Sequence, residues 1–108
     1  MYFDELTSAS AEAEAFLKSV SHRDRLAILC ALQEGEQSVN ELADRLKFSQ
    51  ATLSQHLGRL RLDKLVQTRR EGKRIFYFLA DPRVETLIAA LHACFCSRDT
   101  QRAPNERN

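Results

Sequence analysis

Apolar side chains recur at helical spacing through the first third of the chain and predict two helices there. The first spans residues 7–20 and carries one modest apolar face that includes Phe16 and Val20. The second is expected to begin with Ser21 as its N-cap and to stop at Gly35. Its apolar residues lie on more than one side, as is typical of a buried central helix.

Two further helices follow at close spacing. Ser38 opens a capping box at the start of a helix of about two turns. After a tight connector, Ser49 caps a fourth helix that runs to about residue 64. That helix turns Leu53 and Leu57 to one side and Gln, Ser, Thr and Arg side chains to the other. A short helix, a tight turn and a helix with a polar outer face predict a helix-turn-helix.

The pattern changes from helical to extended after the fourth helix. Residues 65–70 and 74–80 are rich in β-branched and aromatic side chains around a glycine-containing connector, which predicts a hairpin. A last helix over 82–97 is apolar almost all round in its second half, which favours burial in a partner interface. The predicted fold is therefore mainly α with a β-hairpin wing, a homodimeric winged helix-turn-helix (α-α-α-α-β-β-α), over residues 1–97. Residues 98–108 are expected to be a flexible polar tail.

Charge is distributed unevenly although the formal net charge is only +1. Residues 1–54 hold five basic and nine acidic side chains, whereas residues 55–108 hold eleven basic and six acidic ones. Between residues 59 and 74, seven basic side chains stand against two acidic ones. A concentration of positive charge on a helix and hairpin is typical of a surface that binds phosphate.

Composition excludes several classes of protein. The longest apolar run, residues 87–96, is much shorter than the roughly 20 residues that a membrane span needs. No basic residue precedes Lys18, so we expect no secretory signal, and an odd number of cysteines favours a reducing, cytoplasmic compartment. In a chain of 108 residues, most of the core is needed to keep the chain folded and little remains to form a substrate cavity. We therefore expect that the protein is not an enzyme.

The candidate DNA contacts are polar or basic side chains of the fourth helix and the wing. They are Gln50, Thr52, Ser54, Gln55, His56, Arg59, Arg69, Arg70, Lys73 and Arg74. Amides on a recognition helix can bind adenine edges in the major groove, and basic wing residues can follow phosphates or enter the minor groove. His56 lies at the edge of the buried face, so it is either a packing residue or a DNA contact.

Three stretches of the sequence resemble the ArsR–SmtB family of winged-helix repressors. They are Ser38-Val-Asn-Glu-Leu-Ala, Ser49-Gln-Ala-Thr-Leu-Ser-Gln-His-Leu57 and Leu65-Val-Gln-Thr-Arg-Arg-Glu-Gly-Lys-Arg-Ile-Phe-Tyr77. The resemblance implies a homodimer joined through the first and last helices. It also implies binding to a palindromic double-stranded operator that is released when a ligand or an oxidant arrives.

The resemblance also guides the choice of signal. The third helix, SVNELADRL, lacks the cysteines that soft-metal sensors of the family carry there. In the last helix, the spacing of Asp81, Glu85 and His92 matches zinc sensors poorly, so we assign no metal ligands and no cofactor.

Cys30 and Cys96 instead resemble the two thiols of the persulfide- and redox-responsive BigR–SqrR–HlyU branch. The implied switch is a bridge between these two thiols, made by a small-molecule persulfide or another oxidant. The alternative is an arsenite or thiophilic-metal response that uses Cys30, Cys94 and Cys96, with His92 as a further candidate ligand.

Overall fold

The computed structural model describes residues 1–97 of the 108-residue chain. Its elements are α1 (Tyr2–Ser8), α2 (Ser10–Val20), α3 (Arg23–Gln33), β1 (Gln37–Ser38), α4 (Val39–Leu46), α5 (Gln50–Leu62), β2 (Val66–Glu71), β3 (Arg74–Leu79), α6 (Pro82–His92) and the π-helix η1 (Ala93–Ser97). The tail expected at 98–108 lies outside the described residues. Within residues 1–97, no helix combines the length and the apolar character needed to cross a bilayer.

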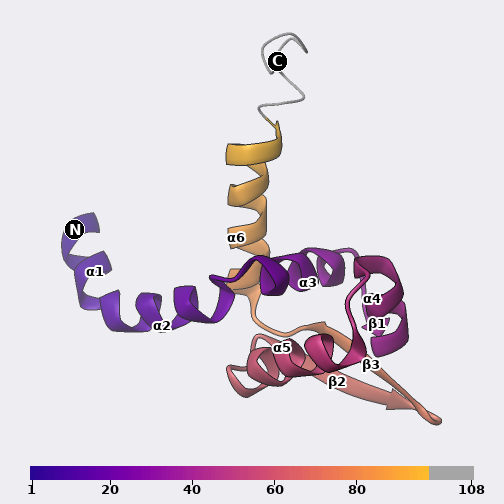
Figure 1. The fold of residues 1–108 in the computed structure, drawn as a ribbon. Coiled ribbons are helices and arrows are strands. Elements are labelled where there is room, and N and C mark those ends of the chain that lie inside the picture. The colour runs from indigo at the N-terminus through magenta and orange to yellow at the C-terminus, as the bar shows by residue number, and fades with distance from the viewer. Residues whose placement is uncertain (98–108) are drawn as a thin grey trace, which may run out of the picture.

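A compact centre is built from α3, α4, α5 and a three-stranded sheet, and two arms extend from it (Figure 1). The arm α1–α2 runs to one side, and the arm α6–η1 rises from the opposite face of α3 to the wing. The core between the central elements holds large apolar side chains that are less than 2% exposed. These are Ile28, Leu29, Leu42, Leu53, Leu57, Leu60, Leu65, Val66 and Val84.

The helix-turn-helix forms as the sequence predicts. Ser38 and Glu41 complete the capping box of α4, with Glu41 N–H donating to Ser38 Oγ and Ser38 N–H donating to Glu41 Oε1. Lys47 ends α4 in the left-handed conformation at φ 61°, which turns the chain sharply toward α5. Ser49 then caps α5 by accepting the Thr52 N–H.

The wing is also confirmed, and it belongs to a larger sheet than predicted. β2 and β3 pair antiparallel from Val66 opposite Leu79 to Glu71 opposite Arg74. Gly72 begins the two-residue turn at φ 64°, the position where type II′ hairpin turns place glycine. β1 adds a third strand to the other edge of β3, so that the sheet order is β1-β3-β2.

The N-terminal helix differs from its prediction, because the segment 7–20 is not one helix that begins at residue 7. Helix α1 already starts at Tyr2, and the helical geometry is interrupted at Ala9 before α2 begins at Ser10. Hydroxyls around the break donate to carbonyls one turn earlier, from Thr7 to Phe3 at 2.6 Å and from Ser10 to Leu6 at 3.2 Å. Such bonds compete with regular helix geometry and bend helices.

Two other helix boundaries are corrected. His22 rather than Ser21 is the N-cap of α3, because its backbone is extended and its Nδ1 accepts the Asp24 N–H at 3.0 Å. The last helix is α-helical only to His92 and continues as the π-helix η1. Asp81 caps α6 ahead of Pro82 by accepting the Arg83 N–H.

Candidate nucleic-acid interface and thiol pair

Helix α5 separates its packing residues from its predicted DNA-reading residues. Leu53, Leu57 and Leu60 are buried against the core. The side chains of Gln50, Ser54, Gln55 and Arg59 are exposed, and Thr52 is half-buried beside the cap. The period of α5 thus places the polar side chains together on one outward face, which is what a helix entering the major groove requires.

Several side chains of that face are held by neighbours. Gln50 donates to Asn40 Oδ1 of α4 at 2.6 Å, which ties the start of α5 to the preceding helix. The hydroxyl of Ser49 donates to Thr52 Oγ1 at 3.0 Å. The sequence analysis did not identify Asn40. Its contact with Gln50 depends on the angle between α4 and α5.

Asp63 orients Arg59 at the other end of α5. The Arg59 Nε lies 2.7 Å from Asp63 Oδ2, and the same oxygen accepts the hydroxyl of buried Ser19 at 2.5 Å. Hydrogen bonds from Ser19 and Arg59 hold the pKa of Asp63 below its usual range. The i, i+4 spacing of Arg59 and Asp63 was visible in the sequence, but the link to Ser19 of α2 was not.

The wing arginines are paired with acidic side chains. Arg69 contacts Glu36 and Glu71, and Arg74 Nη2 lies 3.5 Å from Glu41 Oε2. The guanidinium carbons of Arg69 and Arg74 also lie 4.9 and 4.8 Å from the centre of the Phe76 ring. These contacts hold the side chains of the two arginines on either side of Phe76.

Lys73 lies in the turn at the tip of the hairpin, and Arg70 lies two residues before that turn; both are exposed. Lys73 and Arg74 also line a pocket of about 400 Å³ with Ser38, Asn40, Gln50 and Ser54. Recognition-helix and wing residues therefore meet in one hollow. Polar and basic groups converging on a concave surface suit a phosphate backbone.

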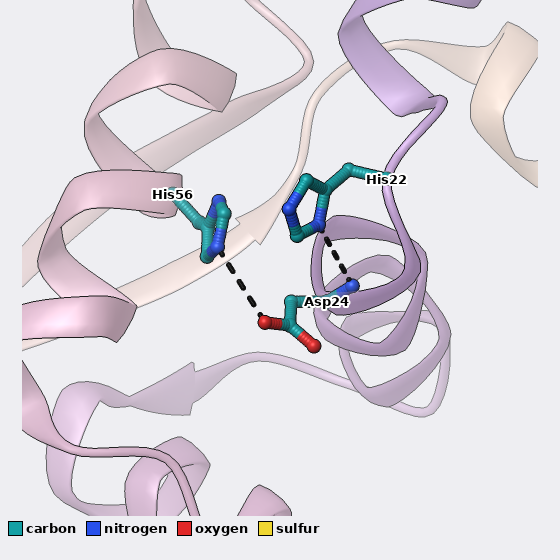
Figure 2. Close-up of side chains that lie close together, drawn as sticks. All are labelled: His22, Asp24 and His56. Carbon is teal, nitrogen blue, oxygen red and sulfur yellow. Dashed lines mark hydrogen bonds and ion pairs between the residues drawn. The ribbon is translucent and has the colours of Figure 1, made fainter.

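His56 lies apart from this face. Its side chain is 12% exposed, and its Nε2 lies 3.8 Å from Asp24 Oδ2 (Figure 2). The ring centre is 4.6 Å from that of His22. Burial, the chief cause, lowers the pKa of His56, with added contributions from His22 and Arg25. The placement matches the packing interpretation of His56, while a DNA contact stays a prediction.

The three cysteines are exposed, Cys30 on α3 and both Cys94 and Cys96 on η1. Partial burial raises the pKa of Cys30, and the negative charges of the Cys96 thiolate and Glu34 raise it further. Cys30 and Cys96 are therefore near enough to interact electrostatically. The sequence analysis predicts that the helix containing Cys30 is apolar on more than one side. In the structure the buried residues of α3 are Ile28, Leu29, Ala31 and Leu32, and Cys30 is exposed.

The fold, the outward polar face of α5 and the basic wing together define a winged helix-turn-helix DNA-binding protein. The matched family model describes a bacterial regulatory protein of the arsR family and covers residues 22–68. That range contains α3, α4 and α5 and the first residues of β2.

Full-length relatives extend the match over most of the chain. The transcriptional activator HlyU of Vibrio cholerae is 45% identical over 89% of both chains. A biofilm growth-associated repressor of Agrobacterium fabrum is 49% identical over 80% of this chain and 74% of its own. The crystal structure of the repressor BigR from Xylella fastidiosa superposes with a TM-score of 0.85. The two chains are 42% identical, and the match covers 89% of this chain and 98% of that one. The chain belongs to the ArsR family of transcriptional regulators.

Proposed function

We propose that the chain is a homodimeric repressor that binds a palindromic operator and releases it when Cys30 and Cys96 become bridged. The outer face of α5 reads base edges, and the wing binds phosphates. The sensing part is supported by the placement of two exposed thiols, Cys30 on α3 and Cys96 on η1, near enough for their charges to interact. The proposal therefore places the signal between α3 and η1.

The dimer is supported by apolar surface on the arms. Tyr2, Phe3 and Leu6 of α1 are 84%, 70% and 56% exposed, and Phe95 of η1 is 69% exposed. Large exposed apolar side chains gathered on projecting elements mark protein interaction sites. A second copy related by a twofold axis would cover both arms and set two α5 helices at the spacing of two half-sites.

The proposed bridge forms in two balanced steps. The Cys30 thiolate attacks the outer sulfur of a persulfide R–S–SH, which gives Cys30–S–SH and releases R–S⁻. The Cys96 thiolate then attacks the Cys30 sulfur, forms the Cys30–Cys96 disulfide and releases HS⁻. The two protein thiols are oxidised, and the persulfide is reduced to a thiol and sulfide.

A bridge would change how α3 packs. The buried face of α3 lies in the same core as Leu53 and Leu57 of α5, whereas Cys30 faces away from that core. Drawing η1 toward α3 would shift the C-terminal arm relative to α5. Because both reading helices of a dimer must match half-sites about one helical turn apart, a small rotation weakens specific binding.

The test uses reduced protein under anaerobic conditions and a DNA duplex selected by that protein from a random pool. We expect a low-molecular-weight persulfide to remove two alkylatable thiols, mapped to Cys30 and Cys96 by peptide mass, and to release the duplex. Cys30→Ser and Cys96→Ser should bind the duplex without responding, whereas the matched control Cys94→Ser should respond as wild type. A response that survives in Cys30→Ser would refute the switch, and arsenite titration of all three variants would then test the thiophilic-metal alternative.

A further inference from the structure

Two histidines and one carboxylate converge where α3 meets α5 (Figure 2). His22 is the N-cap of α3, and Asp24 lies in the first turn of that helix. His56 comes from the middle of α5. One ligand atom from each side chain lies within 4.8 Å of the other two. This cluster could not be predicted from the sequence, because residues 24 and 56 are far apart along the chain.

The donor set suits a particular class of cation. Imidazole nitrogens favour Zn²⁺, Cu²⁺, Ni²⁺ and other first-row transition metals, whereas Mg²⁺ and Ca²⁺ prefer all-oxygen sites. Tetrahedral ligands with bonds of 2.0–2.2 Å lie roughly 3.4 Å apart. The cluster must therefore contract by about an ångström, which exposed His22 can supply by side-chain rotation.

The protonation states and neighbouring charges of the cluster are compatible with a metal ion. The His56 side chain is only 12% exposed, and burial favours the neutral imidazole that a metal requires. Arg23, Arg25 and Arg59 are the nearby cations. Arg23 is 96% exposed, with its Nε 3.9 Å from Asp24 Oδ1, and Arg59 pairs with Asp63. The Nε of Arg25 donates to the Ser19 carbonyl at 2.6 Å and its Nη2 to the Lys18 carbonyl at 3.3 Å. The guanidinium is thus anchored at the end of α2. Asp24 supplies a negative charge that partly balances the ion.

Metal binding has a defined local consequence for α3. The Nδ1 of His22 accepts the Asp24 N–H, so in the neutral ring Nε2 carries the proton. A metal at Nδ1 takes the same lone pair, and a metal at Nε2 moves the proton to Nδ1. In both cases the ion replaces the capping hydrogen bond of α3.

We propose that His22, Asp24 and His56 form a binding site for a divalent transition-metal ion of the Zn²⁺ type. The ion joins the start of α3 to α5, one residue from Gln55, and does not involve the thiols. A pocket of about 430 Å³ lined by His22, Arg25, Gln55, His56 and Arg59 gives the site access to solvent and to further ligands such as water. The site is separate from the Cys30–Cys96 pair, so it stands or falls independently of the proposed thiol switch.

The experiment uses the full chain with Cys30, Cys94 and Cys96 replaced by serine, so that thiolates cannot compete for the probe. Zn²⁺ is titrated into this protein by isothermal calorimetry, and amide spectra are recorded with and without Zn²⁺. We expect one Zn²⁺ per chain, a higher Tm in its presence and a shifted amide signal for Asp24. Both His22→Asn, which keeps a capping acceptor, and Asp24→Asn should weaken binding at least about tenfold, in line with the loss of a metal-site group.

His92 provides the matched control, because it is the remaining histidine of the sequence and lies on α6. His92→Gln should bind Zn²⁺ within twofold of the parent. Absence of Zn²⁺ binding by the parent would overturn the proposal, as would equal affinity in His22→Asn. Circular dichroism in the presence of a chelator establishes that each variant is folded. Because His22 is exposed, we expect His22→Asn to fold, which leaves at least one informative variant.

Discussion

The centre of the molecule and its two arms use apolar side chains in opposite ways. In α3, α5 and the adjoining strands, most large aliphatic residues are buried or half-buried by the chain itself, and Leu62 of α5 is the exception. On α1 and η1, Phe3 and Phe95 remain about 70% exposed. A centre that buries its own apolar surface folds by intramolecular packing. Arms that leave large apolar side chains exposed are typical of surfaces that bind another molecule. The proposed DNA-reading surface accordingly lies on the centre, and the proposed dimer contacts lie on the arms.

The contrast between enclosed and exposed apolar side chains should appear most strongly in the free energy of unfolding. Leu57→Ala removes a side chain that is 1% exposed beneath the reading face, and it should cost about 2–5 kcal/mol. Leu62→Ala, on the same helix but 77% exposed, should change stability by no more than about 0.5 kcal/mol. Urea denaturation measures both values. Equal losses would mean that the outer face of α5 is also packed.

The arms should affect assembly more than folding. Leu6→Glu and Phe95→Glu place charges on the exposed apolar surface, so we expect monomers by sedimentation velocity with native circular dichroism. Loss of the second reading helix should weaken operator binding by about 100-fold, in the range that linked binding modules contribute. Leu62→Glu, an equally exposed position on α5, is the control for assembly and should leave the dimer intact. A dimer that persists in both arm variants would place the interface elsewhere.

Within the centre, α5 and the wing should contribute differently to DNA binding. Gln55→Ala should lower discrimination between operator and random DNA by about 1–3 kcal/mol if Gln55 makes a bidentate base contact. Arg70→Ala or Lys73→Ala should instead weaken binding to all sequences and reduce the salt slope by about one. Fluorescence anisotropy across a salt series separates the two effects. Unchanged operator preference in Gln55→Ala would show that another face of α5 reads the bases.

The same contrast explains what could be predicted from the sequence. Local signals sufficed for the helix-turn-helix and the wing, because Ser38, Ser49 and Gly72 act within a few residues of the structure they determine. The break at Ala9, the strand β1 and the π-helical end of the last arm were missed, since propensity and period do not encode them.

The site residues follow the same rule. The reading face of α5 follows from the 3.6-residue period, and the basic wing from charge. The contacts of Gln50 with Asn40 and of Asp63 with Ser19 join different elements, as does the His22–Asp24–His56 cluster. Such contacts depend on how helices pack, which a single sequence does not specify at the level of individual atoms.

The smallest expected effect concerns the junction of centre and arm, where the pKa of Cys30 is raised. Burial is the main cause, followed by the Cys96 thiolate and then by Glu34. A thiol with a raised pKa is protonated at neutral pH, so alkylation of Cys30 should accelerate about tenfold per pH unit until the pKa is reached. Removing a negative charge lowers that pKa and should speed the reaction at pH 7.5. The increase should not exceed about fivefold, since an exposed charge pair at 4 Å is worth about 1 kcal/mol in water.

Iodoacetamide labelling followed by peptide mass mapping measures the Cys30 rate in each variant. At pH 7.5 we expect Glu34→Gln to speed the reaction, because this carboxylate is already charged. Cys96→Ser should speed it only at alkaline pH, because a neighbouring thiol repels the Cys30 thiolate only once it is itself ionised. Glu36→Gln is the matched control, because that carboxylate faces Arg69 on the wing and should leave the rate unchanged. If Cys96→Ser still behaves like Glu36→Gln at alkaline pH, then the arm does not bring Cys96 to Cys30 in the reduced protein. The bridge would in that case require a movement of η1 before the second thiol can react.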